Sequence, residues 1–122
     1  MKSADDGQPI IGPSARKLGV RVGGTVVDLP VTSDGFVEPG TGGMSVAVDD
    51  AHHLPKHRRP RSLGGEGRDP VFALEAAILL PHLTLRVDRH PHALVEPSLP
   101  CPLSEYDATL AGTRPSWRKT HD

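Results

Sequence analysis

Residues 83–97 read Leu-Thr-Leu-Arg-Val-Asp-Arg-His-Pro-His-Ala-Leu-Val-Glu-Pro, and this stretch decides the fold. Apolar and polar side chains alternate over residues 83–87, which is typical of a strand that buries one face. Residues 93–95 supply a second apolar run, and residues 88–91 between the two runs include a proline that suits a turn. The pattern predicts two antiparallel strands joined through residues 88–91.

A further strand is predicted at residues 44–48, directly after the glycine pair Gly42 and Gly43. Its even-numbered residues are all apolar and share one face, because side chains alternate along a strand. Ser45 therefore points away from the face that packs against the core.

Shorter elements are expected on both sides of these strands. Strands are predicted at residues 18–22, 25–29, 36–37 and 71–74, and a helical turn at residues 75–80. Ser104 is a suitable N-cap for a helix that ends at Gly112 or Pro115, and Asp107 completes an approximate capping box. The predicted fold class is α+β, with a small, twisted, mainly antiparallel sheet and one or two short helices.

The length of 122 residues fits one domain, and 13 Gly and 13 Pro residues favour short elements joined by turns. Residues 1–16 are mostly polar and contain a Gly-Pro pair, so we expect a flexible arm there. Residues 17–115 form the predicted domain, and residues 116–122 form a frayed tail.

Charge and cysteine content narrow the classes of function. The net charge of −1 gives no basis for bulk nucleic-acid binding. The lone Cys101 excludes an internal disulfide and fits a reducing compartment. No apolar run reaches the roughly 18 residues of a membrane span, and no signal-peptide pattern follows the first residues. We expect a soluble, cytoplasmic protein without a membrane partner.

A basic cluster lies in the long irregular segment at residues 49–70. It contains Lys56, Arg58, Arg59 and Arg61. Because guanidinium groups bind phosphate oxygens in a bidentate manner, Arg58 or Arg59 is a candidate for holding a pyrophosphate. A solvated basic loop is the alternative. Residues 64–67 lack the Gly-Lys-Ser/Thr ending of a nucleotide-binding P-loop.

Three residues near the predicted hairpin are candidates for binding or catalysis. Ser45 presents a hydroxyl where Gly42 and Gly43 let a ligand approach the backbone, although a tight turn with a solvated serine explains the same residues. His92 is a candidate hydrogen-bond donor to a ribose or a proton carrier. Glu96 is a candidate stabiliser of positive charge on a sugar ring. A surface histidine and an ordinary edge-strand glutamate are the alternatives.

The seven histidines raise the question of metal binding. His53 and His57 are four residues apart, but Pro55 between them disfavours a helical ligand pair. No cysteine pair or carboxylate cluster completes a coordination shell, so we expect no metal site.

Two segments resemble a known family. Residues 34–39 (Asp-Gly-Phe-Val-Glu-Pro) and 42–46 (Gly-Gly-Met-Ser-Val) resemble the glycine-rich strand entry of a family of type VI secretion effector toxins, and residues 88–97 resemble its second signature. The chain departs from the family at Met44, where the family has a hydroxyl residue, and at Pro91, where it has threonine.

The resemblance implies a compact ADP-ribosyltransferase-like fold and a toxicity linked to NAD. It implies an enzyme that cleaves the nicotinamide–ribose bond of NAD and can transfer ADP-ribose to a macromolecular target. Delivery into a target cell and an immunity protein as partner belong to the same expectation. Family members also hold NAD with an arginine on the first strand, for which Arg21 is the candidate. The other implied roles are ligand entry at Gly42 and Gly43, ribose binding by Ser45 and His92, pyrophosphate binding by Arg58 or Arg59, and charge stabilisation by Glu96.

Two other functions stay open. A non-enzymatic interaction module would use the basic loop at residues 56–61 to dock a protein partner. An RNA-binding toxin is disfavoured, because aromatic residues make up only 3% of the chain and offer few rings for base stacking.

Overall fold

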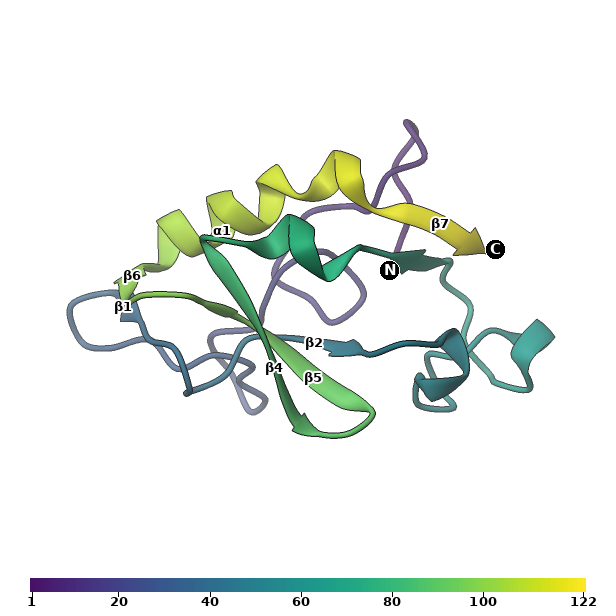
Figure 1. Ribbon diagram of the computed structural model, residues 1–122, viewed down its shortest axis with the longest axis horizontal. Helices are drawn as coiled ribbons and strands as arrows, with labels where there is room; N and C mark the ends of the chain where they lie inside the picture. The colour runs from purple at the N-terminus through teal and green to yellow at the C-terminus, as the bar shows by residue number, and fades with distance from the viewer.

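The computed structural model describes residues 1–122 as an α+β fold with three small antiparallel sheets and one α-helix (Figure 1). The strands are β1 (Phe36–Val37), β2 (Met44–Ala47), β3 (Val71–Ala73), β4 (Leu83–Arg89), β5 (His92–Pro97), β6 (Cys101–Pro102) and β7 (Arg118–His121). The helix α1 spans Leu103–Gly112, and single 3-10 turns lie at Ala51–His53, Arg61–Leu63, Ala76–Leu79 and Arg114–Ser116. The predicted α+β class is therefore confirmed.

The largest sheet has the strand order β2-β5-β4 and contains the predicted hairpin. In its register Leu85 lies opposite Val95 and Val46 lies opposite Ala93, so their side chains share one face. The alternation predicted for these strands is thus confirmed. One face of the sheet is apolar, and the other carries Ser45 and the polar residues of β4.

The core lies between α1 and the apolar face of this sheet. Tyr106 and Leu110 of α1 are buried in one cluster with Met44, Leu83 and Val95. The Tyr106 hydroxyl donates to the Val95 carbonyl over 2.6 Å and accepts from the Met44 N–H over 3.2 Å. The hydroxyl therefore bridges a backbone donor of β2 and a backbone acceptor of β5. Burial of the side chain raises the pKa of Tyr106 above its usual value.

The strands predicted at residues 18–22 and 25–29 are wrong. This segment forms an irregular loop in which the Asp28 carboxylate accepts from the Arg21 backbone N–H at 2.7 Å and from its guanidinium at 2.9 Å. The Asp28 N–H in turn donates to the Arg21 carbonyl over 2.7 Å. Local side-chain to backbone bonds of this kind replace a sheet ladder.

The ends of the chain lie against the domain, where an arm and a frayed tail were predicted. Pro9 is fully buried, and Arg114 donates to its carbonyl over 2.8 Å. At the other end β7 pairs with β3, and the buried Trp117 donates its indole N–H to the Thr113 hydroxyl over 3.0 Å.

The start of the helix also differs from the prediction. It begins at Leu103 after Pro102, without a side-chain cap from Ser104, and ends at Gly112 as predicted. Pro102 is the N-cap residue and has extended backbone with ψ of 145°, so no side-chain oxygen caps the first turn. No helix of the structure has the length and apolar character that a membrane crossing requires.

Candidate functional site

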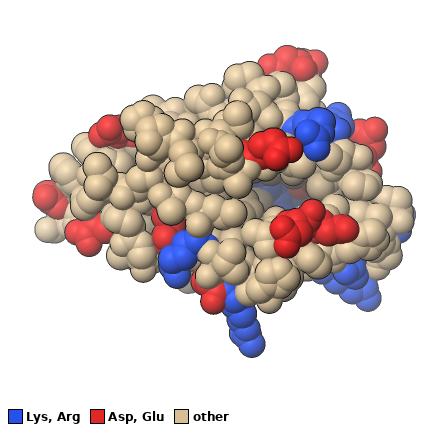
Figure 2. Space-filling view, in the orientation of Figure 1, with Lys and Arg blue, Asp and Glu red and all other residues tan.

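A groove of about 1390 Å³ lies along the outer edge of β2 and is called the β2 groove below. It is bordered by β2, by β3 with the residues that follow it, by β7 and by the segment around Ala51–His53 (Figure 1). Figure 2 shows a hollow on this side of the molecule, with acidic groups on either side of it and basic atoms in its depth. The β2 groove therefore lies between β2 on one side and β3 and β7 on the other.

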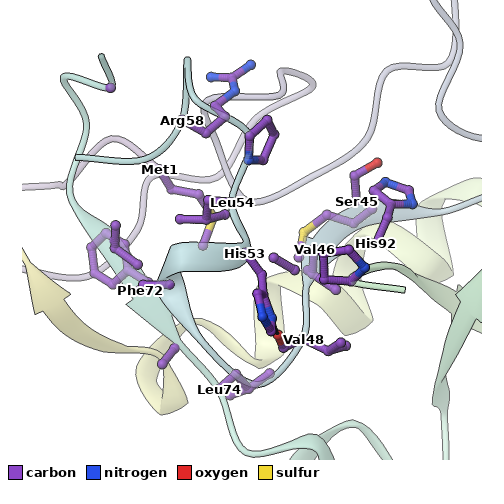
Figure 3. Close-up of a pocket in the computed structure, with 18 of the residues that line it drawn as sticks. Met1, Ser45, Val46, Val48, His53, Leu54, Arg58, Phe72, Leu74 and His92 are labelled. Atoms are coloured by element: carbon purple, nitrogen blue, oxygen red, sulfur yellow. Dashed lines mark hydrogen bonds between the residues drawn. The ribbon is translucent and has the colours of Figure 1, made fainter. Parts of the chain in front are cut away.

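Apolar side chains from more than one element line part of the β2 groove, and this part is called the apolar wall below. It is built from Val46, Val48, Leu54, Phe72 and Leu74, whose side chains are drawn together in Figure 3. Val46 and Val48 come from the apolar face of the main sheet, and Phe72 comes from β3. An apolar wall of this kind suits a ring or an aliphatic chain of a ligand.

Ser45 and His92 lie together at the edge of this groove (Figure 3). Ser45 is opposite Leu94 in the register of β2 and β5, and His92 is two residues before Leu94, so both side chains leave the same face of the sheet. Diagonal neighbours of this type are roughly 7–8 Å apart at Cα, within reach of one small ligand. The Ser45 hydroxyl is exposed and has no hydrogen-bond partner within the chain.

Asp88 is the residue of this site that the sequence did not reveal. Its Oδ1 lies 2.7 Å from His92 Nδ1, and the hydrogen bond from His92 lowers the pKa of Asp88. This contact fixes the His92 ring and leaves its Nε2 directed elsewhere. The sequence shows that Asp88 and His92 are four residues apart across a predicted turn. It does not reveal the β-bulge at residues 87–89, which brings the two side chains into contact.

Glu96 is buried in a hydrogen-bond network within the chain and does not line the β2 groove. Its side chain is only 4% exposed, and the Arg86 guanidinium donates to both of its oxygens, at 2.7 and 3.1 Å. The backbone N–H groups of Gly40 and Gly42 also donate to it, over 2.9 and 3.3 Å. The carboxylate therefore ties the glycine loop to β4 and β5.

Gly42 and Gly43 are required by the chain's own packing. A Cβ on Gly42, whose φ is +150°, would lie 2.2 Å from the Asp28 carbonyl oxygen, and one on Gly43 would lie 2.2 Å from that of Val95. Neither glycine lines the groove. Because they have no Cβ, Gly42 and Gly43 let other backbone segments of the chain pack closely against them. The sequence had predicted that a ligand would approach there.

The three candidate arginines differ in position. Arg21 lines the groove but is paired with Asp28 over 2.9 Å. Arg58 lines the groove and has no ion-pair partner (Figure 3). Arg59 lies outside the lining, donates to the His52 carbonyl over 3.1 Å and has a buried Nε without a partner. The structure thus brings Arg21 and Arg58, but not Arg59, to the groove that holds Ser45 and His92.

His53 and His90 lie close together in the lining of the groove. The rings of His53 and His90 meet edge to face at 5.6 Å, and His90 Nε2 lies 3.5 Å from Asp49. No group of three or more His, Cys, Asp or Glu side chains has an arrangement that would hold a metal ion.

Comparisons of the chain with models of protein families, with curated proteins and with solved structures find no match.

Proposed function

We propose that the protein is a toxin-like enzyme with an ADP-ribosyltransferase-like fold, which binds NAD in the β2 groove and cleaves its nicotinamide–ribose bond. The supporting observation is that Ser45 and His92, two residues of the segments that resemble the toxin family, leave one face of the sheet as diagonal neighbours. They share the groove with Arg58, a guanidinium free to bind a pyrophosphate.

In this proposal the Ser45 hydroxyl and His92 Nε2 hydrogen-bond the ribose on the nicotinamide side. The C1′–N bond breaks, nicotinamide leaves with the electron pair, and the ribose takes up positive charge. Water, or a nucleophile of a macromolecular target, then attacks C1′ and loses its proton. Hydrogen bonds contribute to the rate only where they are stronger in this charged state than in bound NAD.

Carboxylates near the ribose would stabilise its positive charge. Asp88 is the carboxylate next to His92, whereas Glu96 already neutralises Arg86. The proposal therefore gives Glu96 the task of holding the hairpin and the glycine loop in place, and Asp88 that of orienting His92. An immunity protein as partner and the NAD of a target cell's cytoplasm as substrate belong to the same proposal.

Nicotinamide release from NAD by the purified protein tests this function. The Ser45→Ala and His92→Ala variants should each release nicotinamide about tenfold or more slowly, since each loses a hydrogen bond to the ribose. Ser62→Ala and His82→Ala change exposed residues outside the groove and serve as matched controls. Absence of turnover together with absence of a thermal shift on addition of NAD would refute the proposal.

A protein-docking role for the basic loop at residues 56–61 is the second candidate. Lys56 is 3.4 Å from Glu66, but Arg58 and Arg61 have no ion-pair partner and are available to an acidic surface. This role predicts that function survives Ser45→Ala and is lost when Arg58 and Arg61 are both changed to Glu.

A further inference from the structure

The outer edge of β2 carries backbone groups that the chain leaves unpaired. The Val48 N–H donates to the Pro91 carbonyl over 3.0 Å, on the side of β5. Because N–H and C=O groups alternate in direction along a strand, those of Ser45 and Ala47 point to the opposite side. The sheet order β2-β5-β4 places no strand there.

A contact of the chain itself supports this direction. The Gly43 N–H, two residues before Ser45, donates over 2.9 Å to the Asp28 carbonyl on the outer side of β2. The loop that contains Asp28 thus pairs with the first outward-facing position and then turns away. The next two outward-facing positions, Ser45 and Ala47, border the β2 groove.

The charges in the groove indicate the kind of chain that would pair with this edge. Among the lining residues without an ion-pair partner, the basic ones are Lys17, Arg58, Arg68, Arg89 and Arg118, and the acidic one is Glu75. Asp49 and Asp50, also in the lining, contact His90 and His52. Because a neutral histidine does not cancel a carboxylate, Asp49 and Asp50 count with Glu75 as acidic residues of the lining. The five basic residues still outnumber these three, so the lining is positive on balance and complements an acidic occupant.

We propose that the β2 groove binds an acidic peptide in extended conformation, which adds a strand to the outer edge of β2. The peptide backbone would pair with the N–H and C=O groups of Ser45 and Ala47, and its side chains would point alternately to the apolar wall and to the basic groups. This is the geometry of strand addition at an open sheet edge. The inference goes beyond NAD cleavage and does not depend on it.

The first test uses fluorescein-labelled peptides and fluorescence anisotropy. A hexapeptide of alternating Glu and Val should bind saturably, and the same peptide with Lys in place of Glu should not. A third peptide, N-methylated at alternate residues, keeps every side chain but loses the donors of one edge. It should bind about tenfold or more weakly, because it loses two or more hydrogen bonds to the protein.

The second test changes the protein at the same edge. Ala47→Pro removes an N–H that does not face β5, so the ladder to β5 is kept, and peptide affinity should fall about tenfold. Ala47→Ser keeps the N–H and should bind like the parent. Arg58→Glu should weaken binding, whereas Arg61→Glu, outside the groove, should not.

Three outcomes would overturn the inference: no saturable binding of the Glu-Val peptide, equal binding of the N-methylated peptide, or unchanged affinity in a folded Ala47→Pro variant. If Ala47→Pro fails to fold by circular dichroism, the comparison of the two peptides on the parent protein decides the question alone.

Discussion

At the scale of single residues, the strongest interactions surround the buried carboxylate of Glu96. Arg86 and two backbone N–H groups donate to it, and the residue is 3% exposed. Glu96→Ala leaves these donors without their acceptor and should lower the free energy of unfolding by about 2–3 kcal/mol, less than for a fully buried pair because Arg86 reaches water.

Urea unfolding of the purified variants measures this effect. The control is Glu105→Ala, which removes an exposed carboxylate of α1 and should change the stability by less than about 0.5 kcal/mol. An unchanged midpoint for Glu96→Ala would show that the observed network contributes nothing.

The same scale shows what the sequence can reveal about the site. Ser45 and His92 were found because strand alternation predicts the face of each residue, and that prediction needs only local pattern. The engagement of Glu96 with Gly40 and Gly42 could not be found in this way, since it joins residues 56 and 54 positions apart. A carboxylate in a strand looks the same in sequence whether it meets a ligand or an arginine.

At the scale of elements, Tyr106 connects α1 to the β2–β5 pair. Its hydroxyl serves a backbone donor of β2 and a backbone acceptor of β5, and the residue is 1% exposed. Tyr106→Phe leaves both groups buried without that partner and should cost about 1–3 kcal/mol of unfolding free energy.

Thermal or urea unfolding checks this prediction, with Ser104→Ala, which removes an exposed hydroxyl of the same helix, as the control. The Tyr106→Phe variant should also exchange the Met44 amide proton faster, a change that loss of packing elsewhere would not produce selectively. Equal stability and equal exchange would contradict the bridging role of the hydroxyl.

The elements differ in how far the sequence predicts them, for a physical reason. The β4–β5 hairpin follows from alternation because one of its faces is buried. The β7 strand, Arg118–His121, has almost entirely exposed side chains, so its pairing with β3 depends on backbone hydrogen bonds that leave no hydrophobic pattern. The helix end at Gly112 was predictable, but its start after Pro102 replaced the expected Ser104 cap.

At the scale of the whole molecule, ion pairs between distant residues fasten the N-terminal segment to the rest of the domain. Asp6 pairs with Arg114 at 2.6 Å, and Arg16 pairs with Asp69 at 2.7 Å. The first pair joins residues 108 positions apart. The composition of residues 1–16 predicted an arm, because such partners cannot be recognised from local sequence.

These pairs make stability depend on pH in a defined direction. The hydrogen bond from Arg114 lowers the pKa of Asp6, and that from Arg16 lowers the pKa of Asp69, each from an ordinary value of 3.8. A carboxylate with a lowered pKa in the folded state contributes its full stabilisation above the unfolded-state value. The contribution is lost as the pH falls through the folded-state pKa.

The free energy of unfolding, measured with urea at a series of pH values, should therefore decrease as the pH drops below 3.8. A variant with both Arg16→Met and Arg114→Met should be less stable near neutral pH and lose less stability on acidification, because its carboxylates keep a more ordinary pKa. Arg61→Met, which removes an arginine without an ion pair, should keep the slope of the parent. An equal slope in the double variant would mean that other carboxylates govern the acid response, and that these two pairs do not fasten the N-terminal segment.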